Sequence, residues 1–215
     1  MLKINYLRRA TAKGVTLIEV LVAMVVLSIG MLGIAGLQVA TTKYQQGNRV
    51  RGMVAPIFSD IASRIRSNAD QAGNNANTGL ASTSAYVLAD SWDTQQGTTL
   101  TTPSPDCEAT ATTCTSTQRA SYDMMFWRQR IRAALPSGAA LLEGDRSQGF
   151  QATIMWFDKD YTDKGKAAAS QLIKAPICTT STETSDSNRM SLQNCCPATA
   201  GAPVGVRCNR FTFIP

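Results

Sequence analysis

Histidine is absent from all 215 residues of the chain. Without it, the sequence cannot supply a Ser-His-Asp or Cys-His catalytic group or an HExxH metal motif. The phosphate-binding pattern GxxxxGK[ST] is also missing, as are the paired CxxC knuckles of cysteine-only zinc sites. We therefore expect a protein that is not an enzyme, with no cofactor and no catalytic, cofactor-binding or metal-binding residues.

Acidic side chains are missing before Glu19, whereas four basic residues lie in this leader: Lys3, Arg8, Arg9 and Lys13. Four of the 21 basic residues are thus used here, so 17 remain against 15 acidic ones in the rest of the chain. This near balance gives no reason to expect direct nucleic-acid binding. A basic leader before an apolar helix favours retention of that end in the cytoplasm.

A long apolar run follows the leader, and Ser28 is the only polar side chain between Val20 and Leu37. At about 1.5 Å per residue, this helix would span most of a hydrocarbon core of about 30 Å. A secretory signal places its small-residue cleavage site after such a run. Here the processing site is predicted before it, at Gly14, so the apolar helix is expected to stay in the mature protein.

The leader ends in the sequence Gly14-Val15-Thr16-Leu17-Ile18-Glu19-Val20-Leu21-Val22-Ala23. It resembles the class III signal of type IV prepilins and pseudopilins, which prepilin peptidase cuts after the glycine. The first mature residue is usually phenylalanine, and Val15 departs from that pattern while remaining apolar. The resemblance implies cleavage between Gly14 and Val15, N-methylation of Val15, and roles in assembly for Thr16 and Glu19.

Glu19 lies almost at the start of the apolar helix. A charged side chain at the centre of a membrane helix costs roughly 2.5–3.5 kcal/mol on insertion scales, so an acid in this segment needs a reason. Cleavage after Gly14 would create an amino terminus about one helical turn away, at Val15. In the family that the signal resembles, this acid pairs with the terminal amine of a neighbouring subunit. The alternative is a lone interfacial acid that the helix dipole stabilises.

Three glycines, Gly30, Gly33 and Gly36, recur at every third position of the apolar run. Small residues let membrane helices approach one another closely. Glycines also weaken a helix by about 1 kcal/mol each relative to alanine. The sequence leaves both interpretations open and favours a locally softened segment.

The helix is predicted to continue beyond the bilayer as an amphipathic segment. Its apolar residues recur at spacings of three and four: Val50, Met53, Val54, Ile57, Phe58, Ile61 and Ile65. Pro56 is expected to kink this segment, because its ring presses on the Gly52 carbonyl and removes one hydrogen bond. We expect the stripe to pack on a globular domain, with a partner-binding stripe as the alternative.

Six cysteines follow the apolar run and none precedes it: Cys107, Cys114, Cys178, Cys195, Cys196 and Cys208. An even number on the exported side predicts disulfides. Cys107 and Cys114 bracket a short polar stretch and are predicted to pair. A bridge between neighbouring Cys195 and Cys196 would be strained. This leaves Cys178–Cys195 with Cys196–Cys208, or Cys178–Cys196 with Cys195–Cys208.

The region after the long helix begins with two polar stretches, 68–79 and 91–116, which are predicted loops. Residues 85–89 are predicted to form a short strand. A helix should then run from about Ser116 to Leu135, where Pro136-Ser137-Gly138 ends it. One face of this helix is apolar and should pack on the core: Ala120, Met124, Trp127, Ile131 and Leu135.

Strand patterns follow this helix, with a β-branched and aromatic strand at 149–157 and its hairpin partner at 139–142. Residues 209–214 alternate as a closing strand, and the long polar segment 158–207 is an expected loop tied by disulfides. The order of elements resembles the α/β roll of pilins. This implies an α+β fold in which a long amino-terminal helix packs on a small antiparallel sheet with disulfide-tied loops.

The expected divisions are 1–14 for the leader, 15–39 for the transmembrane assembly helix, 40–68 for its amphipathic continuation, and 69–215 for a periplasmic domain. Two stretches are most similar to PilV-type minor pilins. They are Ser28-Ile29-Gly30-Met31-Leu32-Gly33-Ile34-Ala35-Gly36-Leu37-Gln38 and the helix of Trp127 with its following strand.

The resemblance implies a minor pilin of the type IV pilus, processed by prepilin peptidase and active in the initiation or tip complex. Its implied partners are other minor pilins, the major pilin and a large pilus-tip protein. Its implied location is the bacterial inner membrane, with the carboxyl-terminal domain in the periplasm, and then the fibre. The alternatives are a minor pseudopilin of type II secretion and a tip adhesin or DNA-uptake module.

Overall fold

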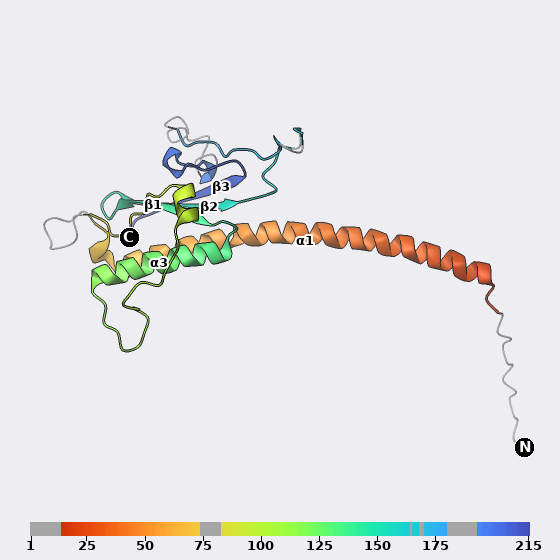
Figure 1. The fold of residues 1–215 in the computed structure, drawn as a ribbon, viewed down its shortest axis with the longest axis horizontal. Helices are drawn as coiled ribbons and strands as arrows, with labels where there is room; N and C mark the ends of the chain where they lie inside the picture. Colours follow the sequence, from red (N-terminus) through yellow and green to blue (C-terminus); the bar gives the residue numbers. More distant parts are fainter. Residues whose placement is uncertain (1–13, 74–82, 164, 168–169, 180–192) are drawn as a thin grey trace, which may run out of the picture. The chain divides into compact units, whose positions relative to one another are not determined.

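The computed structural model describes residues 14–73, 83–163, 165–167, 170–179 and 193–215. Its contacts divide the chain into two compact units, the first ending at Gln46 and the second beginning at Gly47. Helix α1, Leu17–Ser67, contributes to both units (Figure 1). The second unit adds the helices α2, Trp92–Gly97, and α3, Ser116–Ala134, and three strands.

The first unit consists of the apolar part of α1, whose side chains are exposed throughout. By length and composition, α1 is able to cross a membrane. Its lone polar side chain within the apolar run is satisfied inside the helix, because the Ser28 hydroxyl donates to the Met24 carbonyl at 2.7 Å. The polar groups of residues 20–37 therefore have hydrogen-bond partners inside the helix and do not need water as a partner.

The second part of α1 packs into the core of the second unit. Its buried residues lie on one stripe: Val54, Ile57, Ile61, Ala62 and Ile65. Val50, Met53 and Phe58 are partly buried against the same core. The predicted amphipathic stripe is confirmed as a packing face. Pro56 lies inside the helix, and a kink at this residue stays a prediction.

Helix α3 begins and ends where the sequence predicts, because both of its ends carry strong signals. The Thr115 hydroxyl accepts from the Gln118 backbone N–H, and the Gln118 side chain accepts from the Thr115 N–H, which completes a capping box. At the other end, Pro136 follows Leu135. Ala120, Trp127 and Ile131 are buried on the face toward α1.

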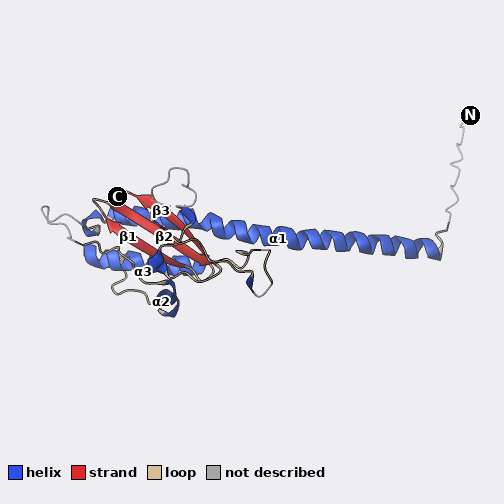
Figure 2. Cartoon of the chain, turned by 90° about the horizontal axis from the view of Figure 1, so that it is seen from above, coloured by secondary structure: helices blue, strands red, loops and turns tan. Residues whose placement is uncertain are grey.

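The sheet is antiparallel with the order β1-β2-β3, formed by Ala139–Asp145, Gly149–Phe157 and Val206–Phe213 (Figure 2). Successive side chains of β2 point to opposite faces of the sheet. Phe150, Ala152 and Ile154 pack with α1 and α3, whereas Met155 packs with carboxyl-terminal residues such as Val206. Both faces are thus covered. This long helix on a small antiparallel sheet is the α+β arrangement expected of a pilin fold.

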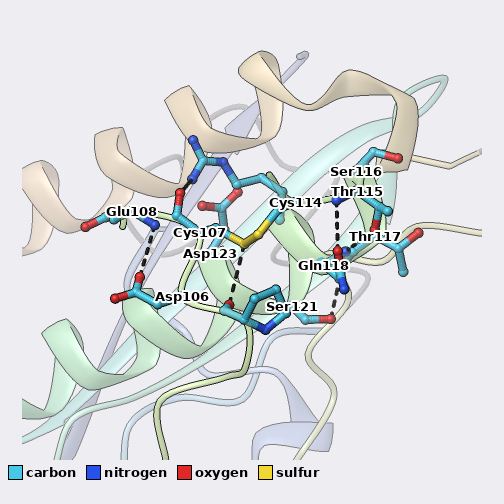
Figure 3. The surroundings of a disulfide bond; sticks show 12 residues. Asp106, Cys107, Glu108, Cys114, Thr115, Ser116, Thr117, Gln118, Ser121 and Asp123 are labelled. Carbon is cyan, nitrogen blue, oxygen red and sulfur yellow. Dashed lines mark hydrogen bonds between the residues drawn. A yellow bond between two sulfur atoms is a disulfide. The ribbon is translucent and has the colours of Figure 1, made fainter. Parts of the chain in front are cut away.

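Three disulfides tie the loops of this fold. Cys107 pairs with Cys114, as the sequence predicts, and the bridge lies directly before the capping box of α3 (Figure 3). Of the two arrangements left open for the other cysteines, the structure has Cys178–Cys195 and Cys196–Cys208. The second of these joins β3 to the preceding segment, which was predicted as a disulfide-tied loop.

Three predictions about the region before α3 are wrong. Helix α2 lies inside the predicted loop 91–116, and a short 3-10 helix, Ala69–Gln71, lies inside the predicted loop 68–79. The predicted strand 85–89 is a single bridge between Leu88 and Leu142. Extending the antiparallel pairing of Leu88 with Leu142 by two residues would place Asp90 beside Ala140. The backbone groups of Ala140 are bonded to the Gln95 side chain instead.

The strand bounds differ from the prediction at three ends. Strand β1 extends to Asp145 because Glu143, Gly144 and Asp145 continue to pair with β2. Strand β3 begins at Val206 and ends at Phe213, whereas 209–214 was predicted. Its earlier residues pair with the last part of β2. Strand β2 has the predicted bounds.

Gln95 closes the outer edge of β1 with its side-chain amide. Its Nε2 group donates to the carbonyls of Asp90 and Ala140, each at 2.7 Å, and its Oε1 atom accepts from the Ala140 N–H at 3.2 Å. The Gln95 residue is 2% exposed. The Gln95 side chain therefore replaces the backbone of a neighbouring strand at Ala140, and it covers an edge of β1 that could otherwise pair with another strand.

Replacement of Gln95 by alanine is expected to destabilise the second unit by about 1–3 kcal/mol, because it leaves buried Ala140 groups without partners. Thermal unfolding of the full chain in detergent micelles, followed by near-ultraviolet circular dichroism, measures the change. The matched control is Gln96→Ala, since Gln96 is exposed and its amide donates to the Ser137 carbonyl at the surface. Equal melting temperatures for the two variants would contradict the proposed edge-closing role.

Candidate assembly site at the start of α1

The predicted processing residues lie immediately before the first turn of α1. Gly14, Val15 and Thr16 are not helical, and the helix begins at Leu17. The Thr16 carbonyl accepts from the Glu19 N–H at 3.1 Å and from the Val20 N–H at 3.3 Å. Thr16 thereby starts the hydrogen-bonding pattern of the helix. Residues 1–13 of the leader lie outside the described residues.

Glu19 is in this first turn, where the helix dipole favours a negative charge. The residue is exposed, and no cation within the described part of the chain pairs with its carboxylate. Its neighbours Val15, Leu17 and Ile18 are 69%, 77% and 67% exposed. An apolar surface with one carboxylate is therefore available to another molecule.

Gly14 has no packing role in the structure. A Cβ atom added there would meet nothing within 4 Å, and the same holds at Gly30, Gly33 and Gly36. Contacts among the described residues therefore do not require glycine at any of these positions. A requirement for a small residue at Gly14 would have to come from another molecule, such as a processing enzyme.

Comparison with protein families finds one match in this region. Residues 9–35 match the prokaryotic N-terminal methylation motif. This match supports a type IV pilin or pseudopilin. No curated protein and no solved structure matches the chain significantly.

The matched segment contains Gly14, Val15, Thr16 and Glu19 and the apolar start of α1. The motif implies processing by prepilin peptidase and assembly with other pilins, and it favours a structural protein over an enzyme. Together with the exposed apolar helix, it fits membrane anchoring followed by incorporation into a fibre. The individual roles of the four residues stay predictions.

A buried polar network joins α1 and α3 in the second unit, and sequence reasoning missed it. The Arg64 Nη1 group donates to Asp123 Oδ1 at 2.8 Å, and the Tyr86 hydroxyl donates to Asp123 Oδ2 at 2.9 Å. Asn68 donates to the Tyr86 hydroxyl at 2.9 Å. Asp123 is 2% exposed. The network therefore fixes α1, α3 and the segment of Tyr86 to one another.

Electrostatics shows that this network is structural. Burial raises the pKa of Tyr86, and the nearby Asp123 charge raises it further, so the phenol stays protonated. Burial alone would lower the pKa of Arg64, but its hydrogen bond to Asp123 and the Asp60 charge raise it overall. Tyr86 therefore stays a neutral phenol, and Arg64 stays a cation. Such paired groups stabilise a fold and are unsuited to proton transfer.

One sequence signal could have revealed Asp123. It lies three residues after Ala120 and four before Trp127, on the buried side of α3. An acid at such a position needs a cationic or hydroxyl partner. Arg64 lies beside the buried Ile61 and Ile65 of α1 and supplies the cation. Within the described ranges, no group of three or more metal-ligating side chains gathers.

Proposed function

We propose that this chain is a PilV-type minor pilin of a type IV pilus. Prepilin peptidase cleaves the inner-membrane precursor after Gly14, and Val15 is then N-methylated. The mature chain joins the initiation or tip complex of the fibre with other minor pilins, the major pilin and a large tip protein. The observation that supports this most is the methylation motif at the start of an exposed apolar helix, where Glu19 pairs with no cation of the described residues.

In this proposal the predicted divisions acquire roles. Residues 1–14 are removed, 15–39 anchor the precursor and pack in the fibre, and 40–68 join this anchor to the periplasmic domain, 69–215. The three disulfides suit a domain exposed outside the cytoplasm. Long disulfide-tied loops suit a terminal position, where one face of the subunit does not have to repeat against its neighbours.

Intact-mass analysis of the protein from its native host tests the processing. The mature chain is expected to begin at Val15 and to carry one additional methyl group. A mature chain that begins after the apolar run would disprove the proposal, because the assembly helix would then be lost. Tandem mass spectrometry of the first peptide locates the methyl group.

Deletion of the gene tests the role in the fibre. Surface pili should fall sharply, and deletion of the retraction motor in the same strain should restore some fibres. Adhesion and DNA uptake should fall only in proportion to fibre number. Normal pili with a selective loss of attachment would favour the adhesin alternative. Normal pili with failed protein secretion would favour the pseudopilin.

Glu19→Ala is expected to insert into the membrane as well as the natural chain does, because it removes a costly charge. Its incorporation into fibres should nevertheless fall strongly, since no carboxylate remains to pair with the Val15 amine of a neighbour. Quantitative immunoblots of sheared pili and of membranes measure both steps. Glu19→Asp keeps the charge and should recover part of the incorporation, and Asp93→Ala, at an exposed residue of α2, is the control. Normal incorporation of Glu19→Ala would refute the pairing.

A further inference from the structure

A cavity of about 520 Å³ lies in the second unit. Its wall includes Arg51 of α1, Trp156 of β2, Arg207 and Asn209 of β3, and Ala175 and Pro176 of the disulfide-tied segment. This volume is in the range of about 300–1,000 Å³ that small-molecule sites occupy. The cavity thus combines an apolar wall with a few polar side chains, which is the usual composition of a ligand site.

The Arg207 guanidinium is held in a fixed orientation at this cavity. Its Nε group donates to Asp158 Oδ2 at 2.6 Å, and its Cζ atom lies 4.0 Å from the centroid of the Tyr161 ring. Among the described residues, its two terminal nitrogens have no hydrogen-bond partner. A guanidinium fixed in this way loses little conformational entropy when it binds a ligand.

The cavity has an excess of positive charge. Arg51 lies 3.9 Å from the same Asp158 carboxylate, and its side chain is 58% exposed. Two guanidinium groups therefore share one carboxylate, and Asp158 also accepts from the Asp160 N–H at 2.9 Å. No acidic residue is among the described residues that line the cavity. One positive charge remains for a ligand with a single negative charge.

We propose that this cavity binds a sugar acid, with the ligand carboxylate bound by the terminal nitrogens of Arg207 and by the exposed side of Arg51. Guanidinium groups bind carboxylates through two parallel hydrogen bonds. The Asn209 amide offers both a donor and an acceptor for ring hydroxyls. Trp156, Ala175 and Pro176 supply an apolar wall for the C–H face of the ring. A single surplus charge matches a carboxylate better than it matches a doubly charged phosphate.

Isothermal titration calorimetry tests the proposal with the full chain in detergent micelles and with D-glucuronate as the probe. Glucuronate should bind, whereas D-glucose, which lacks the carboxylate, should bind at least about tenfold more weakly. N-acetylglycine tests the other source of a carboxylate, a peptide end, and should also bind more weakly than glucuronate. Equal binding of glucose and glucuronate, or no binding of glucuronate at millimolar concentrations, would overturn the proposal. Tighter binding of N-acetylglycine would overturn the sugar-acid assignment.

Two arginine variants locate the site. Arg207→Gln and Arg51→Gln should each weaken glucuronate binding by about tenfold or more. Both arginines pair with Asp158, but Arg207 lies 2.6 Å from its carboxylate and the more exposed Arg51 lies 3.9 Å from it, so Arg51→Gln should disturb the fold less. The matched control is Arg49→Gln, which makes the same charge change on the same helix but does not line the cavity. Equal weakening by all three variants would assign the binding to general charge and would refute the site. This inference goes beyond the proposed assembly function and does not depend on it, because the titration measures ligand binding and not assembly.

Discussion

Gly14→Leu is expected to keep the chain at its full mass of 23.1 kDa in the membrane, with almost no mature protein. The structure has open space around Gly14, so leucine should not disturb the fold. The loss is instead expected from a steric clash between leucine and the processing enzyme. The variant should therefore fold normally while it fails to be cut and fails to enter fibres. Intact-mass analysis of membranes, together with immunoblots of sheared pili, measures the loss.

The matched control for this experiment is Gly47→Leu, which makes the same change at another position where an added Cβ meets nothing within 4 Å. It should be processed normally. Gly14→Ala adds one methyl group and is expected to be processed in part, which would set the size limit of the site. Wild-type amounts of mature Gly14→Leu would show that cleavage does not depend on a small residue there.

Trp127→Ala is expected to destabilise the second unit by about 3–5 kcal/mol, the usual cost of emptying a buried aromatic site. Trp127 is fully buried, and its indole N–H donates to the Ile57 carbonyl at 2.9 Å. The substitution thus removes packing between α3 and α1 together with a hydrogen bond that joins them. Hydrogen exchange of the β2 amides should report the loss, because they exchange only when the core opens.

Two further variants separate packing from hydrogen bonding at this position. Trp127→Phe keeps most of the apolar volume and should cost less than Trp127→Ala. Met125→Ala lies on the same helix and is only partly buried, so it should change exchange at β2 little. If Trp127→Ala and Met125→Ala had equal effects, Trp127 would not be the residue that anchors α3 to the long helix.

The sequence predicted those elements whose ends carry their own signals. Strand β2 lies between Gly149 and Asp158, and α3 lies between the Thr115 cap and Pro136, so local chemistry determined both bounds. The stripe on α1 was predictable for a related reason, because its apolar spacing repeats over several turns. The candidate assembly site was recognisable from its residues alone, since it is a linear motif.

Tertiary contacts decided the parts that could not be predicted. Helix α2 is short and has no apolar period, and it is held by the burial of Trp92 and Gln95. Leu88 forms a bridge and not a strand because Gln95 occupies the next pairing position on β1. Arg207 and Arg51 are far apart in sequence, so only the fold reveals that they flank one cavity.

The adjacent cysteines Cys195 and Cys196 have a consequence for how the protein can be oxidised. In an unfolded chain the two possible pairings close loops that differ by one residue, so loop entropy hardly distinguishes them. The native choice depends on backbone pairing, in which the Cys178 N–H donates to the Cys196 carbonyl and the Cys196 N–H donates to the Pro176 carbonyl. Oxidation before these bonds form would give a mixture of isomers, which thiol–disulfide exchange must then correct. Recombinant production should therefore depend on a disulfide isomerase or on a redox buffer that permits reshuffling.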